Sequence, residues 1–236
     1  MIERAEASDP RLLALLRNHP RVSAVQEGRT PGLSFQQGPW SRSIFEGDAA
    51  LEVSGLVELM DNNPLVCADA ASVPDPASTL ALIALGPLIR AGLLHERPTL
   101  MINVEADETQ VDAFLAREGW REGATVSSES LDFGSVVAAT VMAEVRTPKR
   151  LEDLDDLYEE CYGRSFFVRR DEMADWDVSL VQGKPHALYR MRIAVEDPVS
   201  LLTIQVMADR DGKCGAAQIV HCMNVMAGFE ETFGIA

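Results

Sequence analysis

Four polar side chains stand out in the apolar stretch that ends the chain, and their types could bind or position a small molecule. They are Lys213, Gln218, His221 and Asn224. Buried amides usually find partners within the protein, so Gln218 and Asn224 can be packing residues, and His221 can be a core or interface histidine. The same side chains can instead line a ligand groove, with Lys213 as a cation at its mouth. Both interpretations remain open, and all four are ligand-binding candidates.

Hydroxyl groups form a second set of candidates, in the proline-rich loop at residues 73–79. Ser78 and Thr79 lie there, directly before a long apolar segment. An unactivated hydroxyl is a poor nucleophile, and such residues usually cap a helix, so both are ligand-binding candidates only. Cys67 has apolar neighbours and no histidine near it in the sequence, and we expect it in a buried strand over residues 65–68. The four cysteines show no metal-ligand spacing, so no metal site is predicted.

A helix must position the C-terminal candidates. Gly215, Ala216 and Ala217 open a segment whose apolar residues recur at helical spacing. Gly228 lies where the end of a helix favours a positive φ. The pattern predicts a buried C-terminal helix that ends at this glycine.

This stretch resembles the end of N-acetyl-gamma-glutamyl-phosphate reductase, a semialdehyde-dehydrogenase-type enzyme of arginine biosynthesis. In that family a basic residue leads into Gly-Ala-x-x-Gln, followed by a Met-Asn pair and a Met-x-Gly. The matching positions here are Lys213, Gly215, Ala216, Gln218, Met223, Asn224, Met226 and Gly228. The resemblance covers most of the chain, most weakly before Asp61, and implies an NADP-dependent acyl-phosphate reductase with a cysteine nucleophile.

The cofactor-binding turn departs from the family pattern. The family has a Gly-x-x-Gly-x-x-Gly turn between its first strand and first helix, which cradles the cofactor pyrophosphate. Counting back from His19, the three glycine positions fall on Glu3, Glu6 and Asp9, which leaves little chain for a strand before the helix. Carboxylates would crowd and repel a pyrophosphate, whereas glycines let the backbone approach it. We therefore expect no cofactor, and NADP only if reductase activity remains.

The nucleophile is also missing from its expected place. Pro76 falls where the family has its cysteine, and it carries no nucleophilic group. Between Met101 and Phe133 the chain has no histidine, although the family places a catalytic histidine in the corresponding longer segment. We predict no catalytic residue and a pseudoenzyme that acts in binding or assembly. The alternative is an NADP-dependent acyl-phosphate reductase, or a repurposed enzyme acting on an amino-acid-derived substrate.

The apolar patterns, together with the resemblance, predict an α/β fold in three parts. Residues 1–75 should form a truncated Rossmann-like unit, which includes a strand over residues 48–53. Residues 76–212 should form an α+β dimerisation unit of the semialdehyde-dehydrogenase type, the former catalytic unit, with a long strand at 134–145 and two alternating strands at 189–196 and 200–208. Residues 213–236 should pack back on the first unit.

Composition limits the partners. The formal charge of −16 argues against nucleic acid and anionic membranes, because both are bound by clustered Lys and Arg. The longest apolar run is about half of a membrane span, and no apolar leader follows Met1, so we expect a cytoplasmic protein. The resemblance implies a homo-oligomer, a dimer or tetramer, and leaves room for an active reductase paralogue as a partner.

Overall fold

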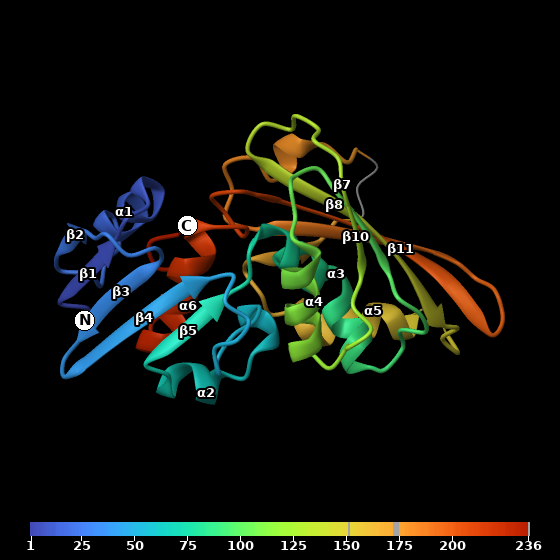
Figure 1. Ribbon diagram of the computed structural model, residues 1–236, viewed down its shortest axis with the longest axis horizontal. Helices are drawn as coiled ribbons and strands as arrows, with labels where there is room; N and C mark the ends of the chain where they lie inside the picture. The colour runs from blue at the N-terminus through green and yellow to red at the C-terminus, as the bar shows by residue number, and fades with distance from the viewer. Residues whose placement is uncertain (151, 172–174, 236) are drawn as a thin grey trace.

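A computed structural model describes residues 1–150, 152–171 and 175–235, which form two β-sheets set side by side along the long axis of the molecule (Figure 1). The N-terminal sheet lies at one end and a larger sheet at the other. No helix among the described residues is long and apolar enough to cross a membrane. The expected α/β fold is confirmed, because helices pack on both sheets.

The N-terminal sheet has the strand order β2-β1-β3-β4-β5. Its strands are β1 (Arg4–Ala7), β2 (Val25–Glu27), β3 (Leu33–Gln37), β4 (Trp40–Glu46) and β5 (Ala70–Val73). β1 pairs with β2, and β4 with β5, in parallel, whereas β3 pairs antiparallel with both β1 and β4. This mixed sheet departs from a fully parallel Rossmann sheet.

The strand β1 overturns the expected start of the chain. Glu6 lies within β1 and Glu3 directly before it, so neither occupies a turn before the first helix. Ala5 and Ala7 point into the core and alternate with Arg4 and Glu6. Because the inward residues are only alanines and the outward ones are charged, the strand pattern is weak in the sequence.

Two further expectations for this unit are wrong. Residues 48–53 form turns and bends, and the strands lie before them in the hairpin of β3 and β4, which turns at Gly38 with φ +57. Residues 65–67 belong to the helix α2 (Asn62–Cys67), so Cys67 is exposed and not part of a buried strand. Pro64 is tolerated in the first turn of α2, where its missing N–H is not needed.

Helices α1 (Pro10–Arg17) and α6 (Ala216–Ala227) share one core with the first sheet. Leu12 and Leu16 of α1 pack in this core with Val220 and Met223 of α6. α6 ends at Gly228, whose φ of +69 is left-handed as predicted. The C-terminal helix therefore lies against the first sheet although the second sheet precedes it in the chain.

The larger sheet has the order β7-β6-β8-β11-β10-β9. Its strands are β6 (Thr99–Ile102), β7 (Thr125–Ser128), β8 (Val136–Arg146), β9 (Val168–Arg170), β10 (Ala187–Ala194) and β11 (Val199–Asp209). β8 and β11 are antiparallel over their whole length, and β10 continues the antiparallel pairing. The three long strands predicted from the sequence are confirmed, apart from small differences at their ends.

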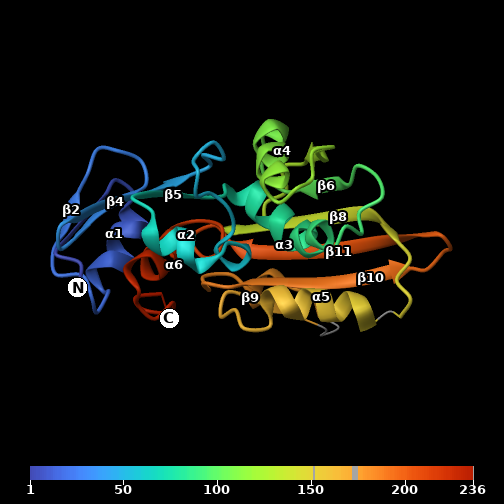
Figure 2. The same ribbon diagram turned by 90° about the horizontal axis from the view of Figure 1, so that it is seen from below.

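Helices cover one face of this sheet. α3 (Pro76–Arg90) lies between α4 (Glu108–Arg117) and α5 (Glu152–Tyr162) and packs on β8 and β11 (Figure 2). Two short 3-10 turns complete the described elements, η1 (Val57–Leu59) and η2 (Val178–Leu180). The buried residues of α3 share one core with the inward side chains of the two central strands, which include Val137, Ala139, Val141, Ile204 and Val206.

The opposite face of the larger sheet carries no α-helix among the described residues. Side chains on this open face include Met101, Thr140, Met142, Leu201 and Gln205, which alternate along the strands with the buried ones. Met101 is 42% exposed and Leu201 is 44% exposed. One end of this face is covered by Val181, which packs with Val136 and Met207, and the remainder is partly apolar and accessible to solvent.

Candidate functional site

Helices α1, α3 and α6 begin around one cleft of about 460 Å³, which lies between the two sheets. Asp9 and Arg11 line it from the start of α1, and Pro76 lines it from the start of α3. Cys214 and Ala216 line it from the start of α6. The N-terminus of a helix attracts anions, because its first N–H groups are free and its dipole is positive there.

Carboxylates of the chain itself cap two of these helices. Asp9 accepts a hydrogen bond from the backbone N–H of Arg11 at 2.9 Å. Asp75 accepts from the N–H groups of Ala77 at 3.0 Å and Ser78 at 3.2 Å, and from the Ser78 hydroxyl. The first helical position of α3 is Pro76, which has no N–H to offer. The anion-attracting ends of α1 and α3 are thus satisfied internally.

Acidic groups dominate the wall of the cleft. Five carboxylates line it, those of Asp9, Glu46, Asp75, Glu105 and Asp211, against the two guanidinium groups of Arg11 and Arg210. Burial raises the pKa of Glu46, and the nearby carboxylates of Asp75 and Asp9 raise it further. Arg11 is ion-paired with Asp211. The lining therefore favours a positive or neutral occupant over an anion.

Lys213 does not lie at the mouth of this cleft. It is 1% exposed, and its Nζ lies 2.7 Å from Oε2 of Glu58, whose side chain is 4% exposed. The hydroxyl of Ser165 donates to the other oxygen of Glu58 at 3.1 Å. Burial by itself would raise the pKa of Glu58, but the charges of Lys213 and His221 hold it below its usual value. The lysine expected at a groove is half of a buried ion pair.

Gln218 joins α6 to the start of α3. Its Nε2 donates to the carbonyl of Pro74 and to Oγ1 of Thr79, each at 3.1 Å. The Thr79 hydroxyl donates in turn to the Pro74 carbonyl at 3.2 Å. The Oε1 atom of Gln218 is buried and has no hydrogen-bond partner among the described residues. Thr79 and Gln218 therefore hold the proline-rich loop against α6.

Asn224 holds the C-terminal segment against α6. Its Nδ2 donates to the carbonyls of Glu231 at 3.0 Å and Phe233 at 2.9 Å. Its Oδ1 lies 2.8 Å from Nε2 of His19, which must donate because a carbonyl oxygen only accepts. Nδ1 of His19 accepts from the N–H of Arg21, so the ring is neutral, and burial lowers its pKa.

His221 lies between two carboxylates. Its Nε2 is 3.0 Å from Oε2 of Glu231, and its Nδ1 is 4.0 Å from Oε1 of Glu58. The hydrogen bond from His221 lowers the pKa of Glu231. The ring also packs on Phe167, with centroids 4.5 Å apart. His221 therefore has a hydrogen-bond partner at Nε2 and an aromatic partner on its face, whereas its buried Nδ1 has no hydrogen-bond partner among the described residues.

The sequence candidates therefore fall into three groups rather than one groove. Ser78, Thr79 and Gln218 surround the start of α3, Lys213 and His221 surround Glu58, and Asn224 contacts His19. Sequence reasoning missed Glu58 and His19, because their partners lie far along the chain. It also missed the capping role of Asp75, although an acidic residue before a proline is a usual signal for the start of a helix.

Comparisons with known proteins agree with this architecture. No known family model matches the chain. N-acetyl-gamma-glutamyl-phosphate reductase of Bacillus cereus (strain 03BB102) is 25% identical, over 69% of this chain and 56% of that protein. The reductase of Bacillus anthracis (strain A0248) is 26% identical over the same shares. The chain thus spans about half the length of the curated relatives it matches.

Solved structures show the same fold at low sequence identity. Aspartate semialdehyde dehydrogenase II from Vibrio cholerae superposes with a TM-score of 0.65 at 13% identity, covering 97% of this chain and 99% of that one. The same enzyme complexed with ASA superposes with a TM-score of 0.61 at 14% identity, covering 92% and 94%. The chain is a distant homologue of N-acetyl-gamma-glutamyl-phosphate reductase and has the semialdehyde dehydrogenase fold.

Proposed function

We propose that this homologue uses the fold for binding or assembly and does not catalyse hydride transfer. One observation carries the proposal. At the cleft where α1 and α3 begin, Asp9 and Asp75 already occupy the positions at which a helix N-terminus would hold an anion.

The residues of the cleft do not fit the pyrophosphate of NADP. Only Ser8 and Asp9 lie between β1 and α1, so no glycine allows a phosphate to approach the backbone there. Asp9, Glu46 and Asp75 lie close enough to one another to raise the pKa of Glu46. Each further pair of like charges about 4 Å apart would cost about 4 kcal/mol near a protein surface. That cost is comparable to a large share of the free energy with which an ordinary cofactor binds.

A thiolate nucleophile is not available in the cleft either. Pro76 has no nucleophilic group. Among the described residues that line the cleft, Cys214 is the only cysteine. Its Sγ lies 3.9 Å from the carbonyl of Pro76. Burial raises the pKa of Cys214, so its thiol stays protonated and unreactive near neutral pH. This argues against the alternative of an active acyl-phosphate reductase.

The open face of the larger sheet supports the assembly part of the proposal. It presents Met101 of the short strand β6 and Leu201 of the long strand β11 to solvent. We infer that a second copy covers this face and forms a homodimer, and that an active reductase paralogue can take the same place. Light scattering should give a dimer for the natural chain. It should give a monomer for Leu201→Lys, but not for the control Val66→Lys on α2. A monomeric natural chain would contradict this.

A reductase assay tests the loss of catalysis. The purified chain is mixed with NADPH and N-acetyl-gamma-glutamyl phosphate, and NADPH absorbance is followed beside a catalytically active relative. We expect no consumption above the background without protein. Turnover that disappears in Cys214→Ser would refute the proposal and identify a nucleophile. A link to arginine biosynthesis remains part of the proposal, since it follows from the homology alone, and so does a cytoplasmic location, which follows from the sequence pattern.

A further inference from the structure

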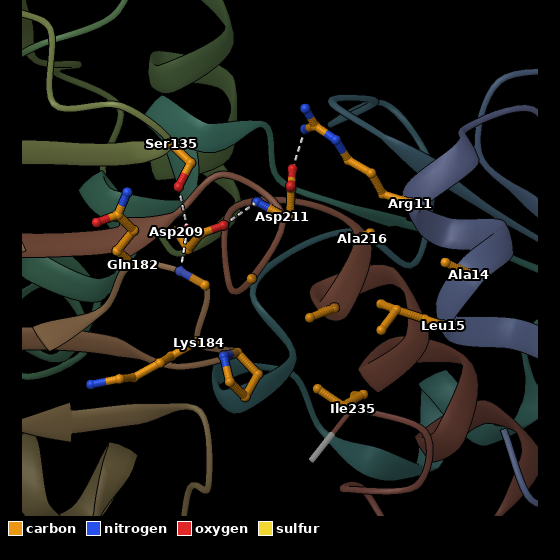
Figure 3. Close-up of a pocket in the computed structure, with 14 residues that line it drawn as sticks. Arg11, Ala14, Leu15, Ser135, Gln182, Lys184, Asp209, Asp211, Ala216 and Ile235 are labelled. Atoms are coloured by element: carbon orange, nitrogen blue, oxygen red, sulfur yellow. Dashed lines mark hydrogen bonds and ion pairs between the residues drawn. The ribbon is translucent and has the colours of Figure 1, made fainter. Parts of the chain in front are cut away.

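A second cavity of about 490 Å³ lies beside the loop between β11 and α6 (Figure 3). Its volume falls within the range of small-molecule sites, about 300–1,000 Å³. Arg11, Asp211 and Ala216 line both this cavity and the acidic cleft, so they form the wall between the two. The positions that match the family's cofactor turn and nucleophile, which are Glu3, Glu6, Asp9 and Pro76, do not line this cavity.

The two sides of this cavity differ in chemistry. Ala14 and Leu15 of α1 and Ile235 of the C-terminal segment form an apolar side, and Gln182 lies on the opposite, polar side (Figure 3). The apolar side can accept an aliphatic group of a few carbons.

The charged groups of the cavity balance, but Asp209 is buried with its own partners and Lys184 points away, which leaves one pair to contact a ligand. Asp209 is 2% exposed and already accepts from Ser135, Gly183 and Asp211. Lys184 donates to the carbonyl of Leu180, and its side chain extends away from the cavity in Figure 3.

Arg11 and Asp211 remain as an exposed pair of opposite charges. Their side chains are 59% and 40% exposed. A guanidinium has five N–H donors and a carboxylate has two oxygens, so one mutual contact leaves both groups able to bind a ligand.

We propose that this cavity binds a small zwitterion with an aliphatic side chain, an α-amino acid of the leucine type. The ligand carboxylate contacts Arg11, its ammonium contacts Asp211, and its side chain packs on Ala14, Leu15 and Ile235. A zwitterion can add one ion pair to Arg11 and one to Asp211 without disturbing their own pairing, whereas a ligand with a single charge can add only one, so a zwitterion fits best. The inference does not depend on whether the chain is a reductase.

Isothermal titration of the full chain with L-leucine tests the inference, with 4-methylpentanoate and isopentylamine as analogues that lack one charge each. We expect sub-millimolar binding of leucine and at least about tenfold weaker binding of both analogues. Arg11→Gln and Asp211→Asn should each weaken leucine binding by about tenfold or more. Ala14→Phe should abolish it by filling the apolar side.

Arg17→Gln is the matched control, because Arg17 is an exposed arginine of the same helix that does not line the cavity. It should bind leucine like the natural chain. The exposed position of Ala14 keeps Ala14→Phe foldable, which a thermal melt verifies. No heat up to about 10 mM leucine, equal binding of an analogue, or binding unchanged in Ala14→Phe would each overturn the proposal.

Discussion

Replacement of Lys213 by methionine should destabilise the protein strongly. The ammonium group lies 2.7 Å from Glu58 and both side chains are almost fully buried. Methionine keeps most of the side-chain volume but leaves a buried carboxylate without its cation. Removal of one partner of a buried ion pair costs about 3–5 kcal/mol.

The size of this loss can be expressed as a melting temperature. In a chain of 236 residues, 1 kcal/mol corresponds to about 2–4 °C, so Lys213→Met should lower the melting temperature by about 6–20 °C. The effect should depend on pH. The native pKa of Glu58 is lowered, so its stabilisation is present above the unfolded value of 4.5 and is lost as pH falls through the native pKa.

Thermal unfolding followed by circular dichroism measures the effect in Lys213→Met, Glu58→Gln and the double variant. The double variant should lose less stability than the sum of the two single losses, because no buried charge remains unpaired in it. Arg150→Met is the control, since it removes an exposed ion pair with Asp153 and should leave the melting temperature nearly unchanged. A loss in Lys213→Met as small as in this control would refute the reasoning.

Three further predictions concern the same elements. Asn224→Leu removes the hydrogen bonds that hold the C-terminal segment and should cost about 1–3 kcal/mol in urea unfolding, and an unchanged midpoint would contradict its role. Burial lowers the pKa of His19, so its contribution to stability should be present above pH 6.5 and be lost as pH falls through the lowered value. His19→Gln should reduce the fall in melting temperature at low pH, measured by thermal unfolding over a series of pH values. An unaltered pH profile would show that His19 is not the source of that fall. Asp75→Ala should cost about 0.5–2 kcal/mol through the lost cap of α3, measured by thermal unfolding, and a gain in stability would show that acidic repulsion outweighs the cap.

The sequence was sufficient for the elements with strong periodicity. The long strands β10 and β11 alternate largely between apolar and polar residues, and β8 is a long run rich in apolar residues, so all three could be predicted as strands. The end of α6 at Gly228 was predictable because a left-handed residue there favours glycine.

Elements with a weak local signal were not predictable. β1 buries only two alanines, and α2 is a short helix that begins in an Asn-Asn-Pro turn. Their form is decided by packing against distant segments, which a local pattern does not contain.

The candidate site shows the same limit. Lys213 and Asn224 were identifiable as polar groups in an apolar stretch, but their partners Glu58 and His19 lie 155 and 205 positions away along the chain. Whether a polar group faces a ligand or a protein partner depends on those distant residues, so the type of residue alone did not decide it.

Titration of the natural chain with NADPH, followed by calorimetry, tests the central claim most directly. The claim is that carboxylates of the chain occupy the anion-binding ends of α1 and α3. We expect no saturable binding up to about 1 mM NADPH at neutral pH and moderate salt. Micromolar binding that is lost on adding NADP would contradict the claim, because the acidic cleft would then accept the pyrophosphate that its charges should repel.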